Sequence, residues 1–393
     1  MKFNVQQRLI AVPLILFTGQ TVAESINLHG FVSQGVIQAA DSNFVENDGD
    51  VSVKLTEIGV NASFRVNSSL RIAGQGVYLN GGNRYPEGAR IDYLFLDWQL
   101  VNTLDWNIKA QIGRNKNYHW LYSSTRDVPH TRPSIVLPQS LYFDAFRDVA
   151  LGVDGIALLA QTNNSLGEWD VNISYGESKI SDQETRNLLG ANIKGKLKHE
   201  SDKQFSIYWR PSLTNWQLGV GVLDADFRYR AANQDVFIRG DIASQRVLMN
   251  LLYQGESWEF ASEIIKERVV VQDLLYSGFA SDVTAEGGYI QARYFPSPEV
   301  TLLARLDIYD KNNKDRDGSA FEASTGGTIP GYFAYMDQAT LGLSWQLFNN
   351  VQIQTELHRV KGAGRLAPFF NPNVEENASE YWNIWAIQLM YWY

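Results

Sequence analysis

Hydrophobic and polar residues alternate one by one along several stretches of the chain. In residues 104–112 polar residues separate the apolar set Leu104, Trp106, Ile108, Ala110 and Ile112. Residues 57–66, 300–308 and 338–347 largely repeat this alternation. Successive side chains of a β-strand point to opposite faces, so each stretch predicts a strand with one apolar face.

The connections between the predicted strands alternate between short and long. The short ones lie near residues 67–69, 102–103, 163–167, 212–215, 255–257, 296–298 and 349–350. The long ones lie near residues 40–51, 80–89, 114–147, 177–203, 229–241, 270–285, 310–337 and 361–380. These connections join sixteen strands, an even number that is typical of bacterial transmembrane barrels. The weak pattern in residues 177–203 leaves about 14 or about 18 strands as alternatives.

Aromatic residues lie close to the ends of the predicted strands. Trp106, Trp169, Trp216 and Trp258 each follow a short connection. Tryptophan at one height on many strands forms a girdle at a membrane interface. The apolar faces are therefore expected to contact lipid, and the polar faces a wet interior, rather than the core of a soluble sandwich.

The last predicted strand ends the chain on an aromatic residue. One of its faces carries Tyr381, Asn383, Trp385, Ile387, Leu389, Tyr391 and Tyr393. This strand resembles the C-terminal strand of Gram-negative outer-membrane proteins, which the barrel insertion machinery recognises. The predicted fold class is all-β, a single closed antiparallel barrel in the outer membrane, in contact with lipid and lipopolysaccharide.

The N-terminus has the features of a secretory signal peptide. Lys2 and Arg8 supply positive charge, residues 9–17 form a short apolar run, and small residues lead to Ala23. The apolar run is far shorter than the ~20 residues of a membrane-spanning helix. We therefore predict a signal peptide at residues 1–23 and one barrel domain at residues 24–393.

Composition excludes several classes of site. The net charge of −9 argues against a nucleic-acid partner. The chain has no cysteine, which excludes zinc–thiolate sites, iron–sulfur clusters and thiol nucleophiles. Aromatic residues reach 12%, yet the mean hydropathy is −0.24, as expected for strands that are apolar on one face only. We expect no cofactor.

Two motifs resemble a known family. Gly113-Arg114-Asn115-Lys116 and the segment 126–135 resemble the porin superfamily that contains the phosphate-selective porins O and P. The resemblance implies a sixteen-stranded barrel, often a homotrimer, with a long third loop folded into the lumen and passive diffusion of small solutes. Phosphate-selective members have a lysine-rich constriction, whereas the positive charge here is mostly arginine, so phosphate selectivity does not follow.

Charged residues gather in the third long loop and on the predicted inner wall. The candidate constriction residues are Arg114, Lys116, Arg126, Asp127, His130, Arg132, Asp144 and Arg147. The candidate wall residues are Arg65, Asp97, Asp105, Lys109, Arg293, Arg305 and Asp307. A narrow aqueous path bounded by protein focuses the field of a few charges, which would favour anions here. Pairing of these cations with the nearby aspartates is the alternative, and would leave a weakly selective pore.

Three functions fit such a barrel: a passive diffusion channel, a barrel enzyme of lipase or protease type, and a structural or adhesin-like barrel. The sequence has no Gly-x-Ser-x-Gly elbow, and its five histidines lack metal-ligand spacing. Sixteen strands enclose an aqueous channel rather than a filled interior. We therefore expect a porin for small hydrophilic solutes, without enzymatic activity.

Two further expectations concern single positions. Residues 313–318 partly resemble a calcium loop, but Ser324 stands where a bidentate glutamate is needed, so an exposed loop is expected. The alternation also places Leu341 in lipid and Thr340 and Gln111 in the wet interior. Arginine should then cost more at Leu341 than at the two inner positions.

Overall fold

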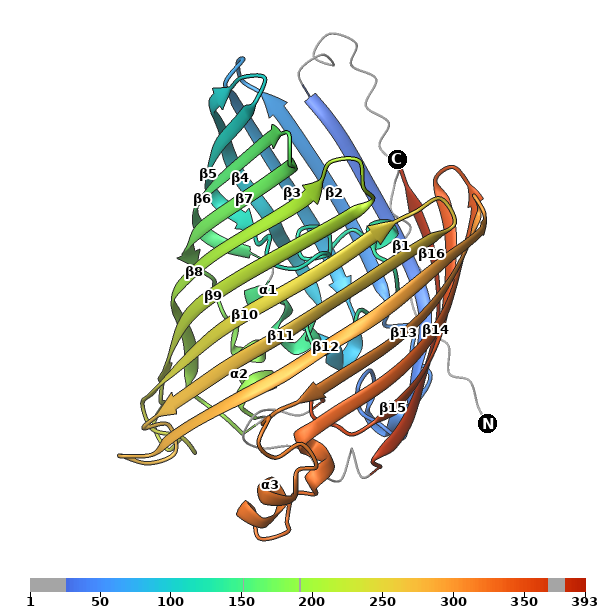
Figure 1. Cartoon of the computed structure of the whole chain (residues 1–393). Helices are drawn as coiled ribbons and strands as arrows, with labels where there is room; N and C mark the ends of the chain where they lie inside the picture. The colour runs from blue at the N-terminus through green and yellow to red at the C-terminus, as the bar shows by residue number, and fades with distance from the viewer. Residues whose placement is uncertain (1–25, 151, 191, 367–378) are drawn as a thin grey trace.

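The computed structural model describes residues 26–150, 152–190, 192–366 and 379–393. The predicted signal peptide at residues 1–23 lies outside the described residues. Sixteen strands make up most of the described chain (Figure 1). They are β1 (Ile26–Ala40), β2 (Thr56–Arg65), β3 (Leu70–Asn80), β4 (Gly88–Asn102), β5 (Trp106–Lys116), β6 (Gly152–Asn164), β7 (Gly167–Glu177), β8 (Lys196–Pro211), β9 (Trp216–Arg230), β10 (Gly240–Gln254), β11 (Trp258–Gln272), β12 (Ala280–Ser297), β13 (Val300–Asp310), β14 (Tyr335–Phe348), β15 (Val351–Lys361) and β16 (Tyr381–Trp392).

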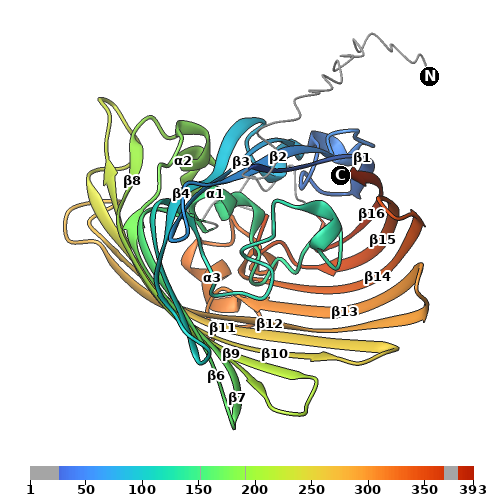
Figure 2. The same ribbon diagram turned by 90° about the horizontal axis from the view of Figure 1, so that it is seen from above.

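The strands form one closed antiparallel barrel. Each strand pairs with its sequence neighbours, and β1 closes the ring by pairing with β16, where Val36 lies opposite Ile387. Figure 2 shows this ring around the segment that follows β5. One end of the barrel carries the short turns and the other carries the long loops, here called the short-turn end and the long-loop end. The closed barrel of sixteen strands confirms the predicted fold.

The predicted lipid-facing sides are exposed and their opposite sides are buried. On β16, Ile387 and Leu389 are about half exposed, whereas Gln388 and Met390, which alternate with them, are almost fully buried. β14 departs from the expected register near its end. A bulge between Gln346 and Phe348 replaces Leu347 on the outer face with Phe348, which is 69% exposed.

The tryptophans near the short turns lie in contact with other aromatic rings. The ring of Trp216 lies 4.8 Å from that of Tyr253 on the neighbouring strand, and Trp258 lies 4.6 Å from Tyr294. Trp106 at the start of β5 is also exposed. The predicted girdle is therefore present at the short-turn end of the barrel.

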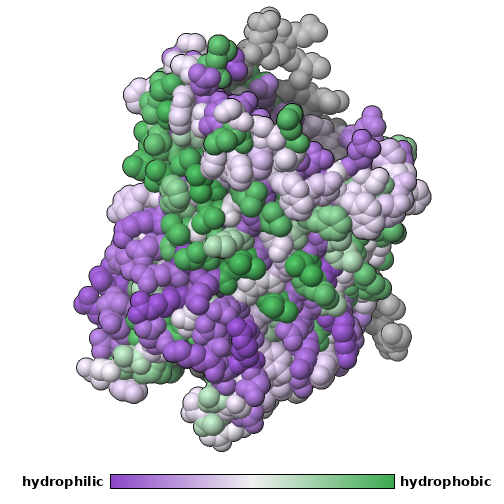
Figure 3. Space-filling model, in the orientation of Figure 1, coloured by the Kyte–Doolittle hydropathy of each residue, from purple (hydrophilic) through white to green (hydrophobic). Residues whose placement is uncertain are grey.

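The outer apolar face does not extend along the whole of the longer strands. On β9 the outward positions from Trp216 to Val222 are apolar, but those from Asp224 to Arg230 are charged, and here the inward positions such as Phe227 are apolar instead. Figure 3 shows the result as a hydrophilic surface over the long-loop ends of β8–β12. Since charged side chains are costly in lipid, this part of the wall projects beyond the hydrocarbon layer.

Short helices lie only in the long loops of the described chain. They are α1 (Arg147–Ala150), α2 (Asp182–Leu189), α3 (Ser319–Ser324), η1 (Asn47–Gly49), η2 (Gly82–Arg84), η3 (Pro129–Thr131), η4 (Asp144–Phe146) and η5 (Gly331–Ala334). No helix in the described ranges is long and apolar enough to cross a membrane. The segment 177–203, predicted as one loop, contains α2 and the first residues of β8, which begins at Lys196, so the predicted loop was too long. A capping box between Ser181 and Glu184 starts α2.

The structure changes the expected cost of arginine at inner positions. Thr340 and Gln111 are only 2% and 3% exposed. They do not face open water, so the premise of a low cost for arginine at these two positions does not hold. A matched comparison needs two outward positions at different heights.

Leu341→Arg and Ala243→Arg make that comparison. Leu341 is 64% exposed on the apolar band, whereas Ala243 faces outward beside Asp226 in the charged part of the wall. We predict that Leu341→Arg lowers the free energy of unfolding by about 2–4 kcal/mol and Ala243→Arg by about 1 kcal/mol or less. Guanidinium titration of the protein folded into phospholipid vesicles measures both. Equal costs at the two heights would contradict the placement of the hydrocarbon layer.

Candidate functional site

The long connection between β5 and β6, residues 117–150 and here called loop 3, lies inside the ring of strands (Figure 2). Its backbone and side chains contact strands on both sides of the barrel. The Leu121 amide donates to Glu263 Oε1 on β11 at 2.9 Å, and the Tyr142 hydroxyl donates to Glu263 Oε2 at 2.6 Å. Loop 3 is therefore attached to the inner wall rather than exposed above it.

Two more acidic side chains hold loop 3 on the same side of the barrel. Glu356 on β15 accepts the Ile135 amide at 2.5 Å and the Val136 amide at 3.1 Å. Asp307 on β13 accepts the Ser140 amide at 3.4 Å. Buried backbone N–H groups need a partner, and these carboxylates supply it where no strand can pair with the loop.

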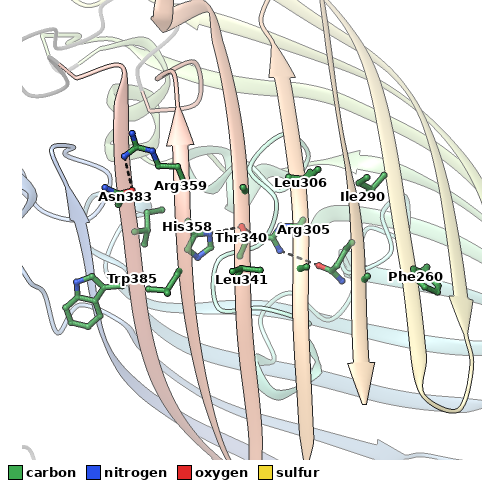
Figure 4. Close-up of a pocket in the computed structure, with 16 residues that line it drawn as sticks. Phe260, Ile290, Arg305, Leu306, Thr340, Leu341, His358, Arg359, Asn383 and Trp385 are labelled. Carbon is green, nitrogen blue, oxygen red and sulfur yellow. Dashed lines mark hydrogen bonds between the residues drawn. The ribbon is translucent and has the colours of Figure 1, made fainter. Parts of the chain in front are cut away.

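Arg305, a basic side chain on the same wall, donates hydrogen bonds to acceptor oxygens of loop 3. Arg305 Nη1 donates to Ser134 Oγ and Nη2 to the Val136 carbonyl, both at 2.8 Å. Figure 4 shows Arg305, Thr340 and His358 side by side on adjacent strands, where Thr340 Oγ1 lies 2.9 Å from His358 Nδ1. This polar row packs under the Ser134–Val136 part of loop 3.

The opposite side of loop 3 is held by buried ion pairs. Arg132 donates to both carboxylate oxygens of Glu57 on β2, at 3.1 and 2.7 Å. Asp144 is shared by two guanidinium groups, Arg126 at 2.6 Å and Arg84 at 2.7 Å. Each of these five side chains is at most 5% exposed. Such two-oxygen pairing compensates the cost of removing the charges from water.

A second chain of charges joins loop 3 to β4 and β5. Arg147 pairs with Asp127, Asp127 lies 3.8 Å from the Lys116 ammonium, and Lys116 pairs with Asp92. All four side chains are almost fully buried. The guanidinium of Arg147 also lies 4.7 Å from the ring of Tyr85.

The cations keep the loop carboxylates ionised. Burial alone would raise the pKa of Asp144, but Arg84 and Arg126 outweigh it and hold that pKa below its usual value. Burial opposes ionisation of Asp127 in the same way, and Arg147 with Lys116 hold its pKa well below the usual value. These two loop carboxylates therefore stay ionised at neutral and mildly acidic pH.

The structure brings most of the predicted loop residues into this network. Lys116, Arg126, Asp127, Arg132, Asp144 and Arg147 are all members, and Arg305 and Asp307 meet the loop from the wall. His130 is half-buried and stacks on Trp392 at 4.4 Å. The cations are therefore engaged with neighbouring groups, which is the pairing alternative raised by the sequence.

Several predicted residues lie elsewhere. Arg114 shares the outward face of β5 with the exposed Ile112 and lies 3.6 Å from Asp154, so it is outside the barrel interior. Asp105 lies in the turn before β5, and Arg65 is exposed at the last position of β2. For Arg114 and Asp105 the predicted place inside the pore was wrong. Arg114 lies on the outward face of β5, and β5 begins only at Trp106, after Asp105.

The remaining wall residues face the interior toward the short-turn end. Asp97 pairs with Arg71 at 2.8 Å, and Arg293 pairs with Glu259 at 3.0 Å. Lys109 lines an inner cavity of about 390 Å³ that loop 3 closes on one side with Tyr118 and other residues. These positions match the inward side of their strands.

Sequence reasoning missed much of what fixes loop 3. Arg84 comes from the loop after β3, and Asp92 is presented by a bulge in β4, so neither follows from simple alternation. Glu263 and Glu356 do lie on the polar sides of regular strands. Their alternation could have marked them as inward, although not as acceptors for a loop more than a hundred residues away in sequence.

A hydroxyl, an imidazole and a carboxylate do meet in the interior. Thr340 contacts His358, whose Nε2 lies 3.0 Å from Glu356 Oε2. All three side chains are buried, and Glu356 is already the acceptor for two loop amides. This row therefore works as an anchor for loop 3.

The segment that partly resembles a calcium loop uses its carboxylates for turns. Asp315 accepts the amides of Ala320 and Phe321, and Asp317 accepts the amide of Ser319. In the described ranges no group of three or more acidic or histidine side chains is placed to hold a metal ion.

Comparison with known proteins finds similarity of fold alone. No family model and no curated protein matches the sequence. Solved structures match over 94% of this chain. An anion-selective porin from Comamonas acidovorans is 11% identical, covered over 99% of its length, with a TM-score of 0.59. The trimer form of OmpT from Vibrio cholerae is 13% identical, covered over 99%, with a TM-score of 0.58. OmpF of Salmonella typhi, in a complex with daunomycin, is 9% identical, covered over 97%, with a TM-score of 0.57. The fold is thus that of outer-membrane porin barrels.

The buried network predicts a large effect of neutralising Asp144. Asp144→Asn leaves Arg84 and Arg126 buried without their counter-ion, which should cost about 3–5 kcal/mol in the local stability of loop 3. Asp154→Asn, at the exposed pair with Arg114, should cost less than about 1 kcal/mol. Hydrogen exchange of the loop amides in detergent-solubilised protein measures the difference. If the loop amides exchanged at the same rate in both variants, the ion pairs of Asp144 would not be what holds loop 3 in place.

Proposed function

We propose that this protein is an outer-membrane porin, through which small hydrophilic solutes diffuse passively. The observation that carries the proposal is the attachment of loop 3 inside a closed barrel of sixteen strands. A barrel of this size leaves an aqueous interior, and an inward loop fixed on both sides narrows it to a constriction. The short-turn end then faces the periplasm and the long-loop end the exterior.

Fixing loop 3 by buried contacts suits a passive pore. The loop is tied by Arg132 to β2, by Glu263 to β11 and by Glu356 to β15, so its position is set from three directions. A constriction built this way keeps one width without an energy source. The proposed activity is therefore conduction, not catalysis.

The proposed selectivity is a mild preference for anions. Most loop cations are balanced by buried carboxylates, so they contribute little net field to the open path. Lys109 differs, because it lines the inner cavity and no ion pair involves it in the described part of the chain. Focusing in a narrow path makes one such charge effective.

The proposal extends to processing and assembly. Residues 1–23 would direct export and be removed, and the aromatic C-terminal strand would be recognised by the insertion machinery. A homotrimer is proposed on the precedent of the trimeric OmpT barrel. Membership of the superfamily of the phosphate-selective porins O and P stays a prediction that rests on residues 113–116 and 126–135.

Reversal potentials in planar bilayers test both conduction and selectivity. In a gradient of KCl the parent protein should show ohmic current with a reversal potential of the sign for anion preference. Lys109→Glu reverses a charge on the path and should shift that potential toward cation preference. Arg114→Glu makes the same change on the outer face and should leave it unchanged.

The outcomes separate the competing functions. No ohmic conductance from correctly folded protein would contradict the porin proposal and favour a barrel enzyme or an adhesin-like barrel. Conductance with cation preference, or equal shifts for Lys109→Glu and Arg114→Glu, would remove the anion preference alone. Arg126→Glu and Arg132→Glu are less suitable, because each breaks a buried pair and displaces loop 3.

A further inference from the structure

The cavity that Lys109 lines combines aromatic and amide side chains. It has a volume of about 390 Å³ and lies between loop 3 and the wall, close to the short-turn end, and it is here called the inner cavity. Loop 3, which lies inside the ring of strands (Figure 2), lines it with Tyr118, Trp120 and Tyr122. Strands β5, β6, β7 and β9 line it with Asn107, Gln161, Asn172 and Gln217. All seven side chains are uncharged, so none of them belongs to the ion pairs that hold loop 3.

The amide groups of the wall lie on neighbouring strands and are only partly used. Asn107 on β5 is directly opposite Gln161 on β6, which places both side chains on the same face. Asn107 Oδ1 accepts one hydrogen bond, from Gln99 at 3.3 Å, and Asn172 Nδ2 donates one within the wall at 3.2 Å. The side chains of Gln161 and Gln217 have no hydrogen-bond partner in the described part of the chain. The wall therefore offers both donors and acceptors to a ligand.

The aromatic side of the inner cavity is held by contacts that do not use the rings of Tyr118 and Tyr122 themselves. The Tyr118 carbonyl accepts the Tyr208 hydroxyl at 2.6 Å, and the Tyr122 amide donates to the Tyr142 hydroxyl at 2.9 Å. The ring of Trp120 lies 5.2 Å from that of Tyr142. Because this part of loop 3 is already fixed, a ligand that packs against it does not have to order it, which lowers the entropic cost of binding.

The charges at the inner cavity are few and mostly balanced. The charged lining residues are Lys109, Asp170 and Arg210. Asp170 accepts a hydrogen bond from Arg210 Nη1 at 2.6 Å, so the acid and one of the two cations form a pair. Four amides thus stand beside one further ammonium group, which can donate to a hydroxyl oxygen as well as to an anion. This balance favours a neutral ligand with many polar groups over a ligand that depends on its charge.

We propose that the inner cavity binds a neutral sugar of one or two rings, with a C–H face of the sugar against the aromatic residues of loop 3 and its hydroxyl groups on the wall amides. A hydroxyl group both donates and accepts hydrogen bonds, as an amide does, and aromatic rings supply the apolar surface for the ring face. The volume lies within the ~300–1,000 Å³ of small-molecule sites. The inference rests on the proposed porin function and deepens it by naming a solute class that pauses in the channel.

Binding is tested by saturation-transfer difference NMR on the full-length protein in lipid nanodiscs, with empty nanodiscs as the blank. The probe is cellobiose, a neutral sugar of two rings, and its counterpart is sorbitol, an open-chain polyol without a ring face. We expect saturable cellobiose binding with a Kd of about 1–10 mM, because a conducting pore must also release its solute. Sorbitol should bind at least about fivefold more weakly.

The first pair of variants tests the aromatic side. Tyr118→Leu removes a ring from the inner cavity but keeps the backbone carbonyl that Tyr208 binds. It should weaken cellobiose binding by about threefold or more. Tyr276→Leu makes the same change at an exposed residue of the connection between β11 and β12, and it should leave cellobiose binding unchanged.

The second pair tests the wall without touching loop 3. Gln217→Leu removes an amide from the inner cavity and should also weaken cellobiose binding by about threefold or more. Gln272→Leu makes the same change at the exposed last residue of β11, at the long-loop end, and should leave binding unchanged. Absence of saturable cellobiose binding, equal binding of sorbitol, or parental affinity in both Tyr118→Leu and Gln217→Leu would overturn the proposal.

Because the NMR measurement needs no conduction, the two proposals fail separately. Cellobiose binding without bilayer current would overturn the porin function and keep the site. Current without cellobiose binding would overturn the site and keep the porin function.

Discussion

Closure of the sheet is the constraint on which the rest of this structure depends. In lipid every backbone N–H and C=O must find a partner within the protein, and an open sheet would leave two unpaired edges. The pairing of β1 with β16 removes both edges at once. Once the ring is closed, each strand has one face toward lipid and one toward an enclosed space, and everything functional must be built in that space.

Loop 3 is the main occupant of the enclosed space, and it meets the same constraint by other means. It has no strand to pair with, so its amides bind side-chain carboxylates such as Glu263 and Glu356, and its cations bind Glu57 and Asp144. The sequence suggested that the loop cations create a positive field in the pore. In the structure most of them instead form ion pairs that hold the loop in place. Lys109, which lines the inner cavity beside loop 3, is in no ion pair in the described part of the chain.

The height of the lipid layer explains the second organising feature. Strands such as β9 are longer than the layer requires, and beyond it the outer face turns charged while the inner face turns apolar. One end of such a strand thus faces lipid on its outer side, whereas the other end faces water on its outer side and apolar residues on its inner side. At the long-loop end, α2 packs against the apolar inner side of β8 and β9. An open cavity remains beside α3, lined largely by apolar residues of β11 and β12.

The sequence by itself determined the class of fold and the location of nearly every connection, and it favoured sixteen strands while leaving 14 or 18 open. These follow from a period of two and from turn residues, which are local properties that a single sequence displays. It also marked loop 3 by its charge and length. The position of Arg114 outside the barrel was not anticipated, nor was the register shift before Phe348.

Only the tertiary structure decided which charges meet. Asp144 lies between Arg84 and Arg126 because two loops from different strands converge inside the ring, and Glu356 reaches Ile135 across more than two hundred residues. Alternation assigns a face to a residue but no partner across an enclosed space. Partners there are set by how the loops fold within the closed ring. The alternation of polar and apolar residues along the sequence does not encode that arrangement.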